Sequence, residues 1–324
     1  MIHVEPKDLS VKEIMDLLVG GVSPRPIALA STISSDGVRN LSPFSFFNAF
    51  GGNPPTVAFS PSRRQRDNTT KDTYNNLMAT KECVIQTVTY AMVHQVSLAS
   101  TEYESHVDEF EKCGLTPISS DIVKPDRVKE SPFQMECMLN QMIHLGDGGA
   151  SGNLAICEVV KFHMTEDIFN NGVIQPELLD AVGRHSANFY TRASGDAIFE
   201  VEKPIGRKGV GFDQLPGYIK NSHIYSGNDL GQFANSEKIP TKNEVHIFLN
   251  TINTVEASEE IFLRFKQQKK YKEMFAVAIV LFKSDHPKAR TFIEQAAKCA
   301  LQCNNTEFAL QAAVSLSILD PEKE

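Results

Sequence analysis

A short polar run holds the residues best suited to binding an anion. Thr69-Thr70-Lys71-Asp72-Thr73 follows the arginine-rich stretch SPSRRQRDN and precedes the helix-compatible YNNLMATKE. The spacing of Thr69 and Asp72 is typical of a capping box, which predicts a helix start. A helix start offers unpaired backbone N–H groups and the positive end of the helix dipole, so it can hold a phosphate. Lys71 adds a positive charge there. The alternative is a capped surface helix with solvated charges.

The segment RNLSPFSFFN (39–48) offers groups for a flat ligand. Side chains alternate along a strand, so Ser42, Phe44 and Phe46 share one face. Pro43 interrupts strand pairing and frees backbone groups. A flat heteroaromatic ligand needs apolar contacts and a few polar groups at its edge, and this segment has both. The alternative is a barrel rim whose serines are satisfied by a turn.

Both segments belong to an N-terminal part made of short β-rich stretches and turns. Ser10 and Glu13 form a capping box for a helix that stops at Gly20-Gly21. Strands are expected at 26–33, 38–47, 56–60, 82–89, 133–146 and 153–164. Many strands, hairpin turns and few helices indicate an antiparallel barrel rather than a parallel, doubly wound sheet.

The C-terminal part has a different pattern. Apolar residues recur at helical spacing in 245–255, 258–268, 269–284, 287–302 and 306–319, so we expect an all-α region. The Gly-rich break 204–211 separates the two patterns, and we see no internal repeat. We therefore expect a domain at 1–205, a linker or arm at 206–242 and a helical region at 243–324.

Bulk properties exclude several classes. The 324 residues carry a net charge of −8, which argues against binding nucleic acid or an acidic membrane. The longest apolar run, Met274 to Phe282, is about half of a membrane span, and the N-terminus does not resemble a signal peptide. The six cysteines include no CxxC pair, which favours reduced thiols and a cytoplasmic location.

Other candidate motifs are weak. Cys299 and Cys303 lie four residues apart on an expected helix and are read as core residues. The nine histidines show no metal-ligand spacing, so we expect no metal site. The glycines of 206–211 follow no clear strand and open no helix, which excludes a dinucleotide loop and favours a linker.

Larger pieces of the chain resemble the flavin reductase-like family of FMN-binding split-barrel proteins. The resemblance rests on SPRPIALASTISSDGVRNLSPFSFFNAFGGNPPTVAFSPS and KDTYNN, and on VDEFEKCGLTP, GNLAICEVV and VGRHSANFYTR further along. It covers about residues 15–205. It implies an α+β fold, a homodimer of six-stranded antiparallel Greek-key split barrels, with one FMN per subunit near the dimer interface. It also implies hydride transfer from NADH or NADPH to the flavin, or electron carriage through it.

The resemblance also assigns site residues, all of them cofactor-binding because the flavin itself carries the chemistry. Those implied to line the isoalloxazine ring and ribityl chain are Ser31, Thr32, Asn40, Ser42, Pro43, Phe44 and Ser45. Ser60, Lys71 and Thr73 are implied to approach the phosphate, and Arg25 to lie at the mouth. Arg184 and Tyr190 border the nicotinamide or the partner's flavin in this reading.

One departure from the family pattern bears on the electron donor. Many members carry a Gly-Asp-His turn near the nicotinamide, whereas this chain has Leu145-Gly-Asp-Gly-Gly149. Three hypotheses follow: an NAD(P)H-dependent FMN oxidoreductase, a flavin-binding electron carrier or sensor whose helical region docks a protein partner, and a scaffold that has lost the cofactor. FMN is favoured over FAD because the motifs account for one phosphate and the chain shows no adenosine site.

Overall fold

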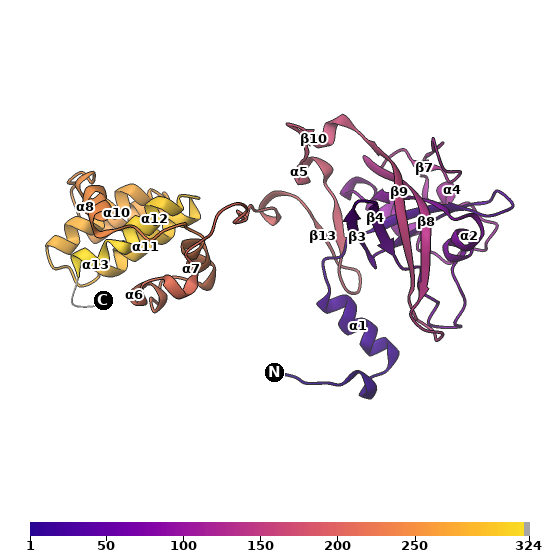
Figure 1. Ribbon diagram of the computed structural model, residues 1–324, viewed down its shortest axis with the longest axis horizontal. Helices are drawn as coiled ribbons and strands as arrows, with labels where there is room; N and C mark the ends of the chain where they lie inside the picture. Colours follow the sequence, from indigo (N-terminus) through magenta and orange to yellow (C-terminus); the bar gives the residue numbers. More distant parts are fainter. Residues whose placement is uncertain (321–324) are drawn as a thin grey trace. The chain divides into compact units, whose positions relative to one another are not determined.

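The chain forms two compact units. The computed structural model describes residues 1–320, and its first unit comprises Met1–Glu200 while the second begins at Val201. Figure 1 shows strands in the first unit and helices in the second. The segment 206–242, for which a linker or arm was expected, holds two helices of the second unit, and Ile219 and Phe233 lie in its core.

The first unit is built on one seven-stranded antiparallel sheet in the order β2-β1-β5-β8-β9-β4-β3. Its strands are β1 (Ala28–Ile33), β2 (Arg39–Phe44), β3 (Phe47–Gly52), β4 (Pro55–Phe59), β5 (Glu82–Thr87), β8 (Phe133–His144) and β9 (Asn153–Met164). The antiparallel split-barrel prediction is therefore confirmed. The sheet has seven strands rather than six because the stretch expected as one strand at 38–47 breaks after Phe44 into β2 and β3.

Two apolar layers hold this sheet. Ala28 and Ala30 of β1 face the barrel interior together with Phe44 and Phe59. Leu29 faces the opposite side, where it packs with residues of the helices α3 (Val93–Leu98) and α4 (Glu109–Cys113). Both faces of β1 are thus buried, which explains its continuous run of small and apolar residues.

Two helices flank the barrel in different ways. Helix α1 (Val11–Gly21) begins at the predicted Ser10–Glu13 capping box and buries none of its residues. Helix α2 (Asp72–Thr80) places Leu77 in the barrel core. The first unit also contains β6 (Pro117–Ile118), β7 (Arg127–Val128), β10 (Phe169–Asn170), β11 (Val173–Ile174), α5 (Pro176–Leu179), β12 (Val182–Arg184) and β13 (Tyr190–Arg192).

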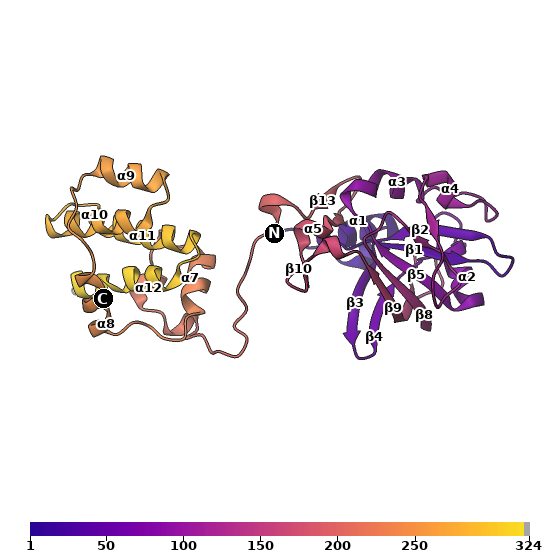
Figure 2. The ribbon, with the colours of Figure 1, turned by 90° about the horizontal axis from the view of Figure 1, so that it is seen from above.

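The second unit is all-α, as predicted for the C-terminal region. Its helices are α6 (Gly217–Lys220), α7 (Gly227–Ala234), α8 (Lys242–Asn250), α9 (Glu259–Gln267), α10 (Tyr271–Lys283), α11 (Ala289–Gln302), α12 (Thr306–Val314) and α13 (Leu316–Leu319). Figure 2 shows α10, α11 and α12 lying side by side, and their apolar faces form one core. Among the residues described, no helix is long and apolar enough to span a bilayer.

Candidate functional site

A polar pocket lies at the start of α2. Its lining comes from β2, from the arginine-rich segment 60–68 (the arginine loop), from the start of α2, from residues 99–103 and from the first residue of α4. The lining residues are Asn40, Ser42, Arg64, Lys71, Asp72, Thr73, Ala99, Ser100, Thr101, Glu102, Tyr103 and Glu109. Four of the residues assigned from the sequence therefore meet at one place: Asn40, Ser42, Lys71 and Thr73.

Lys71 is a half-buried cation in this pocket. Burial, and then the nearby positive charge of Arg64, lower the pKa of its ammonium group. Its Nζ lies 5.7 Å from the centre of the Phe44 ring, and within residues 1–320 it forms no ion pair with a carboxylate. An anion placed in the pocket would restore the favourable environment that burial removes.

The α2 N-terminus is open to a ligand. The predicted Thr69–Asp72 capping box is wrong, because the Thr69 hydroxyl and N–H both donate to Asp67 (2.6 and 3.0 Å). The N-cap position falls on Lys71, whose side chain caps nothing. By contrast, α1, α7 and α8 each begin with a complete capping box. The first N–H groups of α2 thus stay available for an anion.

Arg64 forms the other basic wall of the pocket. Its guanidinium donates to the Thr70 carbonyl oxygen and, at 3.3 Å, to the Thr69 hydroxyl. It approaches the carboxylates of Asp72 and Glu102 only at 3.8 and 3.6 Å. Arg64 therefore holds the turn before α2 in place while keeping loose contacts with acids. The sequence showed it only as one of three neighbouring arginines.

A buried hydrogen-bond network supports the pocket from below. Asn40 Oδ1 accepts from the hydroxyls of Thr32 (3.1 Å) and Thr73 (2.8 Å), while its amide donates to Glu109 at 3.0 Å. Asn76 of α2 donates to Thr32 at 3.1 Å. These bonds tie β1, β2, α2 and α4 together. Thr32, Asn40 and Thr73 thus hold the segments around the pocket together. Asn40 and Thr73 also line it.

Glu109 is a site residue that the sequence did not single out. Its carboxylate accepts from the Leu41 backbone N–H at 3.0 Å as well as from Asn40. Burial raises the pKa of Glu109, and these hydrogen bonds oppose the rise. The only sequence signal was the acidic VDEFE run, in which Asp108 caps α4 through the N–H of Phe110.

Three assigned residues are occupied elsewhere in the fold. The buried Ser31 hydroxyl donates to the Asp126 carbonyl oxygen at 2.5 Å. The buried Arg25 guanidinium donates to the carbonyl oxygens of Val19 and Val22 at the end of α1. Its Nε lies 3.4 Å from the Ser45 hydroxyl oxygen, which accepts. Arg25 therefore anchors α1.

The remaining assigned residues of the barrel have these places. The prediction that Pro43 interrupts strand pairing is wrong: Pro43 pairs with Leu29 inside β2, an edge strand that needs no backbone donor on its open side. The centres of the Phe44 and Phe59 rings lie 5.3 Å apart. Ser60 is buried after β4, where its hydroxyl oxygen accepts from the Asn153 N–H at 3.1 Å. Ser60 is not among the residues that line the pocket.

Arg184 and Tyr190 are brought together in the hairpin of β12 and β13. They form a cross-strand pair with the guanidinium carbon 4.6 Å from the ring centre. The Arg184 backbone pairs with that of Arg25, so this late hairpin lies against the start of the barrel.

A histidine not considered from the sequence contacts α2. His144, the last residue of β8, lies with its Nε2 2.9 Å from the Tyr74 hydroxyl. The following turn packs on the arginine loop, because Asn68 donates to the Asp147 carbonyl oxygen at 2.9 Å. The turn that lacks the family's histidine thus lies close to the start of α2.

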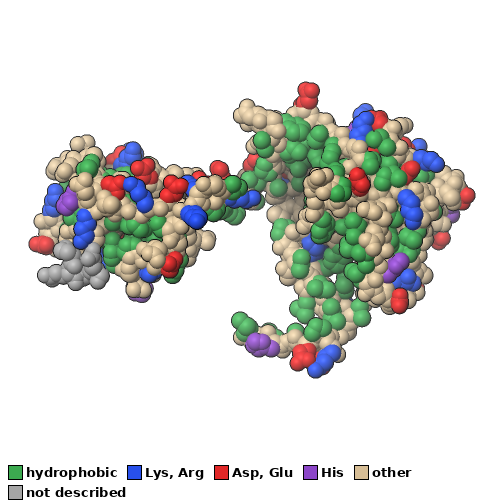
Figure 3. All heavy atoms as spheres, in the orientation of Figure 1, with side chains coloured by type: hydrophobic (Ala, Val, Ile, Leu, Met, Phe, Trp, Pro, Cys, Tyr) green, Lys and Arg blue, Asp and Glu red, His purple; other side chains and the backbone are tan. Residues whose placement is uncertain are grey.

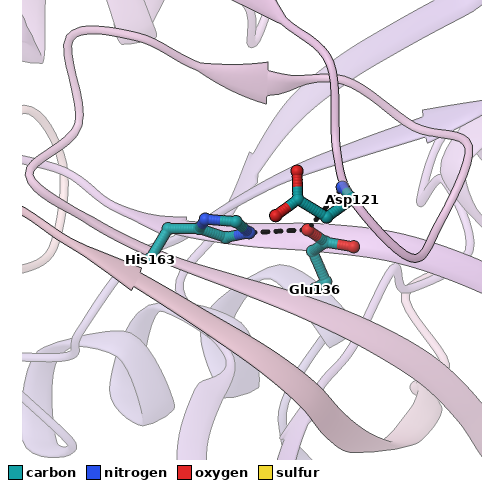
Figure 4. Close-up of side chains that lie close together, drawn as sticks. All are labelled: Asp121, Glu136 and His163. Atoms are coloured by element: carbon teal, nitrogen blue, oxygen red, sulfur yellow. Dashed lines mark hydrogen bonds and ion pairs between the residues drawn. The ribbon is translucent and has the colours of Figure 1, made fainter.

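Asp121, Glu136 and His163 form a second cluster of ionisable groups (Figure 4). Both Glu136 oxygens are occupied, by the N–H groups of residues 121–123 and by His163 Nε2 at 2.6 Å. Burial alone would raise the pKa of Glu136, but these hydrogen bonds prevail and lower it to about 2. Lys161 pairs with Asp121. The cluster therefore fastens the loop at 121–123 to the sheet.

Comparison with known proteins assigns the first unit to a protein family. Residues 20–185 match the family described as flavin reductase like domain. An uncharacterized protein of Aquifex aeolicus is 35% identical over 195 residues, which are 60% of this chain and 97% of that protein. An uncharacterized protein of Halalkalibacterium halodurans is 34% identical, covering 62% of this chain and 96% of its own.

Solved structures with a similar fold cover the same part of the chain. Nitrilotriacetate monooxygenase component B from Bacillus cereus is 30% identical, with a TM-score of 0.58 over 62% of this chain and 98% of that one. A protein with a split barrel domain from Shewanella frigidimarina shares the fold at 23% identity and a TM-score of 0.54, covering 63% of this chain and 100% of its own. The chain therefore belongs to the flavin reductase-like family, and it continues beyond the matched domain into a helical C-terminal unit.

Proposed function

We propose that this protein binds FMN at the start of α2 and works as an NADH- or NADPH-dependent flavin oxidoreductase. The observation that carries the proposal is Lys71, a half-buried cation without a carboxylate partner in residues 1–320, beside a helix start without a side-chain cap. A phosphate monoester would satisfy both. Membership of the flavin reductase-like family supports the choice of a flavin phosphate over other anions.

The pocket residues divide into two roles. Lys71 and the first N–H groups of α2 would hold the phosphate. The Ser42 hydroxyl lines the pocket and makes no hydrogen bond to any residue from 1 to 320, so it is available to a ribityl hydroxyl or the ring edge. Asn40 and Thr73 hold these groups in position through the buried network. FMN remains our choice over FAD because one helix start serves one terminal phosphate.

The flavin supplies the redox chemistry when bound, taking up a hydride and passing on electrons. The chain's own residues bind and orient it. The polar groups at the α2 start need to supply only position and charge. The lining offers the Lys71 ammonium, the Arg64 guanidinium, hydroxyls and an amide for this, and it also holds the carboxylates of Asp72, Glu102 and Glu109. Arg184 and Tyr190 are proposed to border the nicotinamide or a partner's flavin.

We further propose a homodimer formed in part through α1. Four apolar side chains of this helix region are about half exposed or more: Val11 at 49%, Leu17 at 56%, Leu18 at 48% and Val22 at 62%. Figure 3 shows hydrophobic side chains gathered over α1. A contiguous apolar surface of this kind marks an interaction site in most soluble proteins.

A flavin-binding electron carrier or sensor is the second candidate, and one observation favours it. The turn Leu145–Gly149 lies against the loop before α2 and presents no ring that could stack on a nicotinamide. A carrier would receive its electrons from a protein and would need no nicotinamide site.

The deciding experiment is an absorption spectrum of the purified protein with FMN, followed by anaerobic NADH and NADPH. Rapid bleaching supports the oxidoreductase, and bound flavin that stays oxidised supports the carrier. Binding by Lys71→Ala should be compared with that by Lys129→Ala, which removes an exposed lysine of the same unit. A protein that binds no FMN, or a Lys71→Ala affinity equal to that of the control, would remove the proposed site.

A further inference from the structure

A basic patch lies where α9 ends and α10 begins. Over RFKQQKKYK (264–272) the chain carries five cations and no acid. All five side chains are exposed: Arg264, Lys266, Lys269, Lys270 and Lys272. Figure 2 shows α9 and α10 as neighbouring helices, and we call these five residues the basic patch.

The patch is not neutralised within residues 1–320. None of its members forms an ion pair there, and Lys266 donates only to the amide oxygen of Gln295, at 3.1 Å. Other lysines of the same unit are paired, as in Lys238–Glu244 at 2.5 Å and Lys288–Glu259 at 2.6 Å. Five cations without an ion pair in residues 1–320 thus lie together in one stretch.

The stability of the helices does not account for the patch. Arg264 and Lys266 suit the last turn of α9, where a helix attracts cations. Lys270 and Lys272 lie at the opposite kind of end, the start of α10, where the helix dipole disfavours a positive charge. Five neighbouring like charges also repel one another. Lys270 and Lys272 therefore do not contribute to the stability of α10 in the free protein.

The charge distribution restricts the partner. Residues 201–324 hold 16 Lys and Arg against 15 Asp and Glu, whereas residues 1–200 hold 16 against 25. The negative charge of residues 1–200 repels a long polyanion such as nucleic acid. A short acidic segment needs to contact only the patch, and charges farther away than a Debye length are screened. Four of the five cations are lysines, which lack the bidentate fork that favours phosphate.

Apolar surface beside the patch indicates the rest of the recognition. Leu263 is 45% exposed, and Phe265 is half-buried with Arg264 and Lys270 over its ring at 5.4 and 5.9 Å. Mixed charged and apolar contacts are typical of protein–protein interfaces, in which charge steers the encounter and apolar groups are buried.

We propose that the basic patch docks a partner protein through a short segment that carries carboxylates next to apolar side chains. This interaction involves only the second unit and is independent of the flavin assignment. It gives the helical unit, which has no counterpart in the matched family domain, a recognition function of its own.

The test uses the full-length protein and a fluorescein-labelled twelve-residue peptide of alternating Glu-Glu-Leu, with a Gln-for-Glu peptide as its control. Anisotropy should show binding of the acidic peptide at low salt that weakens about tenfold or more in 0.5 M NaCl. The variant Lys269→Gln/Lys270→Gln/Lys272→Gln should also weaken it about tenfold or more, because three exposed charge pairs are lost.

A matched variant with the same charge change separates a specific site from net charge. Lys203→Gln/Lys208→Gln/Lys283→Gln alters three exposed lysines of the same unit outside the patch and should leave affinity within about twofold. The proposal is overturned if wild type does not bind the acidic peptide, if both triple variants weaken it equally, or if the patch variant binds normally. Tighter, patch-dependent binding of a twelve-nucleotide DNA or of anionic phosphatidylserine vesicles would also overturn it. Unchanged melting temperatures confirm that both variants are folded.

Discussion

Replacing Lys71 with methionine should have opposite effects on the free protein and on its complex with FMN. Methionine keeps the length of the alkyl stem and can pack on the Phe44 ring, which lies 5.7 Å from the ammonium in the wild type. It removes only the charge. Because burial lowers the pKa of Lys71, the charged form is disfavoured in the fold. We therefore expect Lys71→Met to stabilise the FMN-free protein by about 1 kcal/mol.

For a unit of this size, about 1 kcal/mol corresponds to a rise in melting temperature of about 2–4 °C. The FMN complex should lose about 1–3 kcal/mol, the range for a charged hydrogen bond, so the Kd should rise about 5- to 150-fold. Scanning fluorimetry measures the first effect, and titration of flavin fluorescence measures the second. Lys129→Met, at an exposed position, is the control for both.

The pH dependence of the same pair of proteins adds a sign test. The folded-state pKa of Lys71 is lowered, so its stability penalty is fully present below that pKa, shrinks as pH rises above it and is gone once pH exceeds the pKa of the unfolded chain. The advantage of Lys71→Met should therefore shrink in alkaline buffer, while wild-type FMN affinity falls as Lys71 loses its proton. A variant that is less stable at neutral pH, or that binds FMN like wild type, would refute the reasoning.

Three further predictions concern separate parts of the first unit. Glu136→Gln should lower the free energy of unfolding by about 2–4 kcal/mol at pH 7. Only the ionised carboxylate stabilises the fold, so urea unfolding should show this loss fading as pH falls from about 4.5 towards the pKa of about 2. An equal loss at pH 3 and pH 7 would contradict this mechanism. Ser42→Ala should weaken FMN binding about 3- to 10-fold at unchanged melting temperature. Ser45→Ala loses the contact with Arg25 and should mainly lower the melting temperature. The reverse pattern would exchange the roles of the two serines. Leu17→Glu with Leu18→Glu should convert a dimer into a monomer in light scattering, and an intact dimer would exclude α1 from the interface.

Sequence periodicity predicted most of the fold because the long strands and helices follow simple patterns. β9 has the bounds expected from its alternation, and α11 lies within the expected range 287–302. The break between β2 and β3 was not predicted, because SPFSFF reads as a continuous strand and only pairing partners show where the chain turns. The helices α6 and α7 were missed for a related reason. Each is too short to show a helical repeat, and its few apolar residues can be recognised as core residues only once the rest of the core is known.

The candidate site was predictable in part. The residues 69–73 pointed to an anion site, and the pocket does form around Lys71 and Thr73. The sequence could not predict the partner of the Thr69 hydroxyl. Asp67 lies two residues earlier, and the hydroxyl donates to its carboxylate instead of capping α2. Nor could it bring Glu109 beneath Asn40, because that contact joins segments 69 residues apart.

Arg25 and Lys71 show how bonding partners separate a structural cation from a ligand-binding one. Arg25 lies at the C-terminal end of α1, the negative end of a helix, and donates to carbonyl oxygens there. Burial and the neighbouring Arg184 lower its pKa as well, but the hydrogen-bond donors of its guanidinium are satisfied by the fold. Lys71 lies at the N-terminal end of α2, where the dipole disfavours a cation. Its side chain forms no hydrogen bond or ion pair with any residue from 1 to 320, and its Nζ lies 5.7 Å from the centre of the Phe44 ring, while Glu102 and Asp72 attract it only from a distance. Burial and helix polarity both act against its charge in the free protein. An anion bound at the same helix start would give Lys71 a counter-charge and would itself be favoured by the dipole of α2. For this reason the flavin proposal depends on Lys71 rather than on Arg25.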